Sequence, residues 1–250
     1  MAVTIPEVDN SNIKHCMLID LTIDNTTYYI SNAYKKITHN TNVYTELGSL
    51  LAVDQLREDI KTTAGVVLLT GPTGSGKTTT LYTFLNALNN DDVKIITLED
   101  PVEYQLEGIN QVQVNSEIGF NFSAGLRSIV RQDPDIIMLG EIRDKETAQI
   151  ALQSALTGHL VFSTVHTNDA ASAYTRLLDL GVEEFLLNAA LVSIVAQRLA
   201  RKVCSHCSVP HPEQAQLIEK YNLNVLANKF SLTDIKLRKG QGCEHCAHTG

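Results

Sequence analysis

Short apolar runs and longer stretches with helical spacing alternate along most of this chain. Buried strands are predicted for four apolar runs, at 66–69, 93–98, 136–139 and 160–165. Helices are predicted between or after them, in a stretch that ends near 88 and at 123–131, 145–156, 170–180 and 183–201. Because strands that alternate with helices form a parallel sheet covered on both faces, we expect an α/β fold with a mainly parallel sheet. Ligand sites of such a sheet lie at the carboxyl ends of its strands.

The pattern is weaker at the start of the chain and changes near its end. Residues 1–46 are rich in Asn and Thr and hold two modest strand-like runs, 17–23 and 27–30, without a chemical motif. We expect this part to be a small β-rich segment or the remnant of a lost domain. Residues 47–203 would form the α/β core, and 204–250 would form a small lobe that carries cysteines.

The composition is that of a globular protein and narrows the classes of partner. Hydrophobic residues make up 44% and charged residues 19% of 250, so the chain can bury a sizeable core. The formal net charge of −8 argues against a surface built for nucleic acid or anionic lipid. No apolar run approaches the roughly 20 residues that cross a bilayer, and the first residues lack the pattern of a secretory signal. We therefore expect a cytoplasmic protein.

One segment has the spacing of a phosphate-binding loop. It reads Gly71-Pro72-Thr73-Gly74-Ser75-Gly76-Lys77-Thr78 and fits G-x-x-x-x-G-K-[ST] at every defined position. Glycines let backbone N–H groups turn inward around phosphates, and the helix that follows offers its free N–H groups and positive dipole end. Lys77 would place a charge against the β- and γ-phosphates, and Thr78 would offer its hydroxyl to Mg²⁺. The alternative, a structural Gly-rich turn, would not need a lysine there.

Carboxylates gather where two of the predicted strands end. Glu99, Asp100 and Glu103 follow the second strand, and Glu141 follows the third. So much negative charge favours a bound metal ion, and a solvated acidic turn is the structural alternative. Many phosphate-loop enzymes hold Mg²⁺ with an Asp at the end of such a strand. This chain has Gly140 there, which makes Asp100 or Glu103 the natural substitute. Glu103 and Glu141 then compete to steady the metal's water shell and to orient the attacking water.

Two histidines bracket the fourth predicted strand. His159 precedes it and His166 follows it. A histidine at a strand end is more often a hydrogen-bonded structural residue than a catalytic one. Beside a γ-phosphate, His166 could instead sense that phosphate through a hydrogen bond.

Together these segments resemble the secretion ATPase superfamily, the motors of type II secretion and type IV pilus assembly. Residues 71–78 match its Walker A element, and 96–104 look like its acidic Asp box. Residues 126–144 look like its Walker B region, and 157–168 look like its His box. The order and spacing of the motifs agree, and glycine in place of the Walker B Asp is usual in this family. The match runs from about residue 47 to residue 250.

The resemblance implies a RecA-like core that binds ATP with Mg²⁺ and hydrolyses it to ADP and phosphate. The expected nucleotide-binding residues are 71–78 and Thr79. The expected Mg²⁺-associated residues are Thr78, Asp100 and Glu141. By the same resemblance, Glu103 polarises water, Glu141 supports the metal, and His166 contacts the γ-phosphate side. These three residues are the expected catalytic residues.

The resemblance also implies an assembly and a place in the cell. The family works as ring-shaped homo-hexamers whose closure drives assembly of pilin-like subunits. The implied partners are an inner-membrane platform protein and a recruitment protein, with membrane contact only through them and no nucleic acid. The sequence does not distinguish pilus assembly from type II secretion.

Four of the five cysteines form two C-x-x-C hooks, Cys204/Cys207 and Cys243/Cys246, with a helix expected at 213–226 between them. Two hooks can complete a closed tetrahedral Zn²⁺ site. A histidine ligand in place of one cysteine, or four thiols without a metal, are the alternatives. The pattern resembles the tetracysteine insert of pilus-assembly and type II secretion ATPases. Retraction ATPases typically lack that insert, so it favours assembly or export.

Compared with full-length relatives, the chain is expected to lack most of the N-terminal half and the extreme C-terminus. In those relatives, arginines from an N-terminal domain and its linker help neutralise the γ-phosphate, whereas residues 1–46 contain no arginine. Two alternatives to a secretion or pilus motor ATPase remain. One is a relative that binds ATP but turns it over weakly or not at all. The other, which the acidic balance disfavours, is a nucleic-acid motor ATPase.

Overall fold

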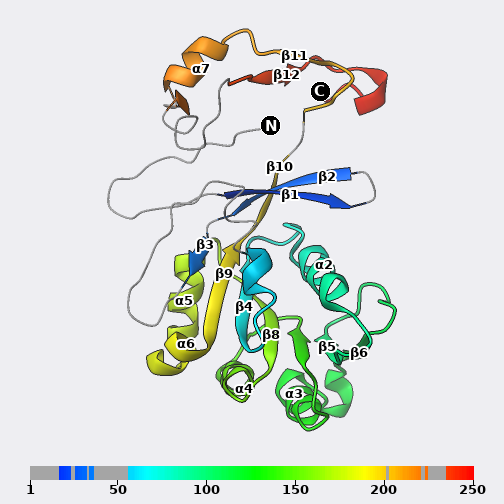
Figure 1. The fold of residues 1–250 in the computed structure, drawn as a ribbon, viewed down its shortest axis with the longest axis vertical. Coiled ribbons are helices and arrows are strands. Elements are labelled where there is room, and N and C mark those ends of the chain that lie inside the picture. The colour runs from blue at the N-terminus through cyan, green and yellow to red at the C-terminus, as the bar shows by residue number, and fades with distance from the viewer. Residues whose placement is uncertain are drawn as a thin grey trace.

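A seven-stranded sheet forms the centre of the molecule, with strand order β3-β9-β4-β8-β7-β5-β6 (Figure 1). The structure is a computed structural model and describes residues 17–23, 26–32, 34–36, 56–200, 203–220, 223–224 and 235–250. The strands of this sheet are β3 (Tyr34–Lys36), β4 (Gly65–Thr70), β5 (Ile95–Glu99), β6 (Asn110–Gln113), β7 (Ile136–Leu139), β8 (Leu160–Val165) and β9 (Leu191–Ala196).

Neighbouring strands of this sheet run parallel, except that β3 pairs antiparallel with β9 at one edge. The four strands predicted from apolar runs are confirmed as β4, β5, β7 and β8, and the mainly parallel sheet is confirmed with them. The sequence does not predict β6. This edge strand is short and largely polar, so it lacks an apolar run.

Helices connect the parallel strands, except that residues 100–109, between β5 and β6, form no helix. They are α2 (Lys77–Leu88), α3 (Phe122–Val130), α4 (Lys145–Leu156), α5 (Ala170–Asp179) and α6 (Glu184–Ala190), with a short 3-10 helix η1 (Ser116–Ile118). Three of them begin at a residue whose side chain accepts the backbone N–H of the residue three positions further on. The caps of α3, α4 and α5 are Asn121, Asp144 and Asp169.

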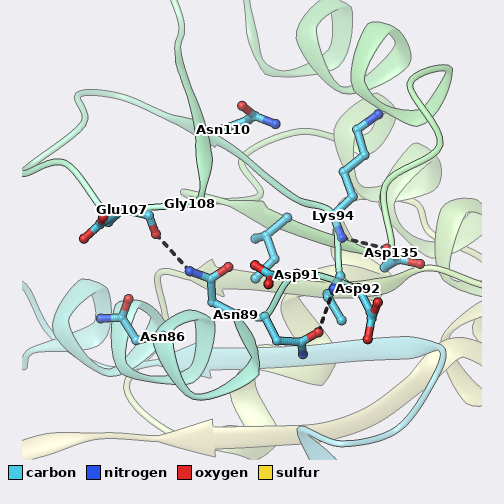
Figure 2. Close-up of a pocket in the computed structure, with 12 residues that line it drawn as sticks. Asn86, Asn89, Asp91, Asp92, Lys94, Glu107, Gly108, Asn110 and Asp135 are labelled. Carbon is cyan, nitrogen blue, oxygen red and sulfur yellow. Dashed lines mark hydrogen bonds between the residues drawn. The ribbon is translucent and has the colours of Figure 1, made fainter.

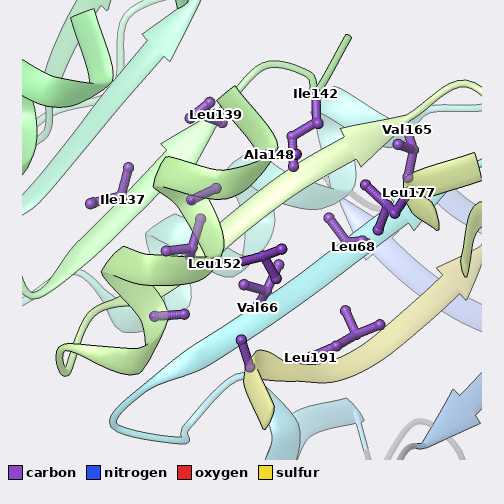
Figure 3. Close-up of a cluster of buried hydrophobic side chains, with 14 of the residues drawn as sticks. Val66, Leu68, Ile137, Leu139, Ile142, Ala148, Leu152, Val165, Leu177 and Leu191 are labelled. Atoms are coloured by element: carbon purple, nitrogen blue, oxygen red, sulfur yellow. The ribbon is translucent and has the colours of Figure 1, made fainter. Parts of the chain in front are cut away.

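The parallel strands are buried on both faces, which explains why they read as continuous apolar runs. Successive side chains of a strand point to opposite faces. Val66 and Leu68 of β4 therefore pack in one cluster with α3 to α6, while Val67 and Leu69 pack in another with α2. Figure 3 shows Leu152 of α4 over the first cluster.

The helix predicted at 183–201 is wrong beyond residue 190. α6 ends at Ala190, and the chain continues as β9 beside β4 and then as β10 (Arg198–Ala200). The β-branched residues Val192, Ile194 and Val195 suit a strand better than a helix. Periodicity alone does not separate a buried apolar strand from a buried helix, which is why the boundary at residue 190 is not visible in the sequence.

Two smaller sheets complete the described part. β1 (Met17–Ile23) pairs antiparallel with β2 (Thr26–Asn32), and β10 joins the other side of β2. The strand-like runs predicted at 17–23 and 27–30 are therefore confirmed, and the rest of 1–46 lies outside the described residues. β11 (Ser208–Pro210) pairs antiparallel with β12 (Arg238–Gly240) in the lobe beyond β10 (Figure 1).

The lobe beyond β10 also holds α7 (Gln214–Lys220) and a short 3-10 helix η2 (Glu244–Cys246). α7 lies within the helix predicted at 213–226, of which 221–222 and 225–226 are outside the described residues. Throughout the described ranges, no helix is both long and apolar enough to span a bilayer.

Candidate functional site

The segment 71–78 forms a tight loop between the buried end of β4 and the start of α2. Gly71 has φ 141°, and a Cβ atom there would lie 2.2 Å from the carbonyl oxygen of Gln197. Gly76, with φ 83°, precedes α2, and no side chain caps this helix. The first N–H groups of α2 are therefore left for a ligand, as phosphate binding at a helix N-terminus requires.

Lys77 lies folded against this loop. Its ammonium donates hydrogen bonds to the carbonyl oxygens of Gly71, at 2.9 Å, and Pro72, at 3.1 Å. Burial lowers the pKa of Lys77, and the nearby charge of Glu141 acts in the opposite direction. The phosphate loop follows β4 and Glu141 follows β7, so both lie at the carboxyl ends of the parallel strands.

Gln197, directly after β9, contacts the phosphate loop, and the sequence does not predict this contact. Its side chain, 1% exposed, donates from Nε2 to the carbonyl oxygen of Ser75 at 2.7 Å. Its backbone N–H donates to the carbonyl oxygen of Thr70 at 2.8 Å. Because residue 197 was predicted to lie inside a helix, only the end of β9 beside β4 reveals this contact.

The order β4-β8-β7-β5 brings four motifs to one edge of the sheet, since the strands are parallel and their carboxyl ends coincide. The loop after β8 is fixed directly to the end of β4. The hydroxyl of Thr70 donates to the carbonyl oxygen of Thr167 at 2.5 Å and accepts its N–H at 3.1 Å. His166, the residue before Thr167, is thereby held next to the phosphate loop.

Glu141 is the centre of a small charged cluster at this edge. His166 Nε2 lies 3.0 Å from one carboxylate oxygen, and Arg143 donates to the other at 2.5 Å. Arg143 also reaches Asp100, at 3.9 Å. Burial alone would raise the pKa of Glu141, whose side chain is 12% exposed, but Arg143 and His166 outweigh burial and lower the pKa. Glu141 is thus held in its charged form.

The acidic segment after β5 divides into residues with different surroundings. Glu99 is buried at 3% exposure, and its carboxylate accepts hydrogen bonds from Thr97, Tyr82 and Gln111. Hydrogen-bond donors of the protein therefore compensate its charge. The crowding of these carboxylates predicts a metal ion that relieves it, and Glu99 does not need one. Glu103 is exposed.

His159 lies at the opposite end of β8 from His166. Its Nδ1 is 2.8 Å from the carbonyl oxygen of Ser154 in the last turn of α4. This contact agrees with the structural interpretation of His159 given by the sequence.

The four hook cysteines come together in the small lobe. Their Sγ atoms all lie within 4.8 Å of one another, with separations of 3.9 Å for Cys204–Cys243, 3.9 Å for Cys207–Cys246 and 3.7 Å for Cys243–Cys246. A tetrahedral ion with metal–sulfur bonds of about 2.3 Å places its sulfurs about 3.8 Å apart. The backbone N–H of Cys243 donates to Sγ of Cys246 and lowers the pKa of that thiol, whereas burial raises the pKa of the Cys207 thiol to about 11. The cluster could therefore hold a metal ion.

Comparison with known proteins decides the family. The family described as Type II/IV secretion system protein matches residues 36–250. The chain belongs to this family.

Several curated family members are close in sequence. Type II secretion system protein E of Aeromonas hydrophila is 50% identical over 208 residues, which are 82% of this chain and 40% of that protein. Type II secretion system ATPase E of Vibrio cholerae is 48% identical over 200 residues, 79% of this chain and 38% of that protein. Type IV pilus assembly ATPase PilB of Thermus thermophilus is 48% identical over 197 residues, which are 79% of this chain and 22% of that protein. The chain thus spans less than half the length of these relatives.

Two solved structures share the fold. The pilus retraction motor PilT, solved with bound ADP, has a TM-score of 0.52 at 25% identity and covers 88% of this chain and 71% of PilT. The Legionella pneumophila ATPase DotB has a TM-score of 0.51 at 23% identity, with 90% of this chain and 70% of DotB covered. The RecA-like α/β architecture expected for the secretion-system family agrees with these structures.

A polar pocket of about 830 Å³ lies away from the phosphate loop and Glu141 (Figure 2). Its walls come from the end of α2 and from residues that precede β5, β6 and β7, so it lies at the amino ends of the strands. Several of its polar groups are already bonded to one another, for example Lys94 N–H to Asp135 at 2.7 Å and Asn89 to the carbonyl of Glu107 at 2.8 Å. The family's nucleotide motifs lie at the other end of the strands.

Replacement of Arg143 by alanine is expected to raise the pKa of Glu141, because burial then opposes ionisation with only His166 against it. The stability that ionised Glu141 contributes is present above its unfolded pKa and is lost as pH falls through its folded pKa. In Arg143→Ala this loss will therefore occur at higher pH. A ¹³C NMR titration of the side-chain carboxyl carbon, assigned with Glu141→Gln, measures the shift.

Arg127→Ala is the matched control, since Arg127 pairs with Glu146 instead. It should leave the pKa of Glu141 unchanged. An unchanged Glu141 titration in Arg143→Ala would show that the ion pair does not control this carboxylate.

Proposed function

We propose that this chain binds ATP at the loop 71–78 and hydrolyses it to ADP and phosphate. The observation that carries the proposal is the loop itself, which has an uncapped helix N-terminus and a lysine folded over it, at the end of the sheet that also carries Glu141. Gly71 fits this loop, because a Cβ atom there would lie 2.2 Å from the carbonyl oxygen of Gln197, so only glycine lets the loop pack this closely against the end of β9.

Phosphate binding follows from residues of β4 and α2. The uncapped N–H groups in the first turn of α2 would donate to the phosphates, and the dipole of α2 favours negative charge there. Lys77 exchanges its two loop carbonyls for the β- and γ-phosphates. Thr78, Asp100 and Glu141 are the residues that would hold Mg²⁺, which would neutralise charge on the phosphates.

Hydrolysis requires a water molecule aligned with the γ-phosphorus. The oxygen of water would form the new bond to the γ-phosphorus, the bond from that phosphorus to the β–γ bridging oxygen would break so that ADP leaves, and the proton of the water would pass to the Glu103 carboxylate. We assign orientation of the water to Glu103, whose carboxylate is exposed. Both oxygens of Glu141 are occupied by Arg143 and His166, which suits a supporting role. His166, held beside the phosphate loop through Thr167, contacts the γ-phosphate side.

The activity would drive a larger machine. Relatives named for type II secretion and for type IV pilus assembly both match this chain at about half identity. We infer a motor for one of these two processes that works as a homo-hexamer at the cytoplasmic face of the inner membrane, with a platform protein and a recruitment protein as partners. The four-cysteine lobe favours assembly or export over retraction.

Lys77→Ala is expected to lower ATP turnover by about 100-fold or more, because it removes a charge aimed at the phosphates. Phosphate release at saturating Mg-ATP measures the rate, and a fluorescent ATP analogue measures binding. Glu103→Gln should lower the rate at every Mg²⁺ concentration without weakening nucleotide binding. Glu141→Gln should lower the rate and also shift the Mg²⁺ dependence to higher concentration.

Glu117→Gln is the control, since Glu117 lies exposed in η1. It should keep the parental rate. Turnover in Lys77→Ala equal to that of the parent would contradict the proposal. Tight ATP binding without turnover in the parent would favour the second candidate, a relative that binds ATP without hydrolysis.

We also propose that the four hook cysteines hold one structural Zn²⁺. Their sulfur separations of 3.7 to 3.9 Å fit a tetrahedral Cys₄ site. Among the described residues of the lobe, Leu223 alone is a buried apolar residue, so an ion would supply much of the cohesion of this part.

The purified protein is expected to contain about one zinc ion per chain by elemental mass spectrometry, in accord with one Cys₄ site. A double variant with Cys204→Ser and Cys243→Ser should lose the metal and unfold its lobe at lower temperature. Cys16→Ser, which changes a cysteine outside both hooks, should retain the metal. Retention of zinc by the double variant would contradict the Cys₄ assignment.

A further inference from the structure

The backbone of the acidic loop, defined as residues 102–106, is held by side chains from outside it. Gln111 of β6 accepts the N–H of Leu106 at 2.7 Å and donates to the carbonyl oxygen of Tyr104 at 3.2 Å. Backbone groups that lack partners in a helix or sheet need such contacts to keep one conformation. The acidic loop thus has a defined place against β6.

Tyr82 ties the same loop to α2. Its hydroxyl oxygen accepts the N–H of Glu103 at 3.4 Å. Its ring meets that of Tyr104 edge to face, with centroids 4.7 Å apart and an interplanar angle of 81°. Such a ring pair adds to the stability of a contact. Because α2 begins at Lys77, Tyr82 links the loop that carries Glu103 with the helix that carries the phosphate-loop lysine.

Glu99 in turn holds the side chains of Tyr82 and Gln111. One of its carboxylate oxygens accepts from the Tyr82 hydroxyl, and the other accepts from Gln111 at 3.2 Å and from Thr97 at 2.5 Å. Strand alternation points Thr97 and Glu99 to the α2 face of β5. Burial and the Glu99 carboxylate raise the pKa of Tyr82, so its hydroxyl keeps the proton that it donates.

A buried carboxylate in such a network needs its donors. Tyr82 is 0% exposed and Glu99 is 3% exposed, so water does not replace a donor that is removed. Loss of a hydrogen bond to a buried charged group is costly. The network therefore resists rearrangement, which is the property that a positioning element requires.

We propose that the Tyr82 hydroxyl, anchored by Glu99 and Gln111, is the group that positions Glu103 relative to the phosphate-loop helix. Its effect on turnover rests on the proposed function, but its hold on the acidic loop does not. Glu99, although part of the acidic motif, serves this support and not the metal.

Tyr82→Phe removes the hydroxyl and keeps the buried ring. Hydrogen–deuterium exchange of the full chain should become faster at the amide of Glu103, because its acceptor is gone. Turnover should fall by about 10- to 100-fold in kcat with KM for ATP within about twofold, since a displaced water-orienting group affects chemistry more than binding. Gln111→Leu, which frees the Leu106 amide, should act in the same direction.

Two controls separate positioning from loss of stability. Thr97→Val removes another donor to Glu99 without touching the acidic loop; it should lower the melting temperature but leave exchange at Glu103 near that of the parent. Tyr174→Phe removes a hydroxyl bonded to Asn188 on a distant helix and should change neither exchange at Glu103 nor turnover.

The outcomes distinguish the two proposals. Parental exchange at Glu103 in Tyr82→Phe would overturn the positioning role, as would faster exchange with unchanged kcat in a parent that hydrolyses ATP. A fall in turnover of equal size in Thr97→Val would show that stability, not position, is at work. If the parent has no Lys77-dependent turnover, the proposed function fails, and exchange at Glu103 alone decides whether Tyr82 holds the loop.

Discussion

Parallel pairing of β4, β8, β7 and β5 is the constraint on which the candidate site depends. Their carboxyl ends meet at one edge, so segments far apart in sequence become neighbours in the order phosphate loop, His166, Glu141 and Glu99. Burial of both faces fixes the register of these strands, since a slip of one residue would turn apolar side chains from one cluster to the other. The fold therefore places the chemistry before any ligand arrives.

The negative charges of Glu99 and Glu141, at the carboxyl ends of the strands, are compensated in two ways. Glu99 faces α2 and is compensated by neutral donors, chiefly the Tyr82 hydroxyl. The Glu141 side chain is mostly buried, and its charge is compensated by the exposed side chains of Arg143 and His166. The first arrangement suits permanent support. The second can open, because partners on exposed side chains exchange readily for a ligand.

The sequence predicts the parts of this structure that depend on local pattern. Continuous apolar runs indicate β4, β5, β7 and β8, and the spacing of the phosphate loop and of the cysteine hooks indicates their chemistry. It does not predict contacts between distant elements. Gln197 reaches Ser75 only because β9 lies beside β4, and the 183–201 stretch has a spacing that fits a buried helix as well as a buried strand. Glu99 could have been separated from Asp100 by strand alternation, had the position of α2 been known.

The proposed function requires the loop 71–78 to hold the phosphates of ATP. A structure of the chain with Mg²⁺ and a non-hydrolysable ATP analogue would show this contact. We expect the Lys77 ammonium to leave the carbonyl oxygens of Gly71 and Pro72 and to contact the β- and γ-phosphates, with Glu141 still at the carboxyl end of β7. A nucleotide bound elsewhere, or Lys77 still bonded to the loop carbonyls beside a bound nucleotide, would contradict ATP binding by this loop.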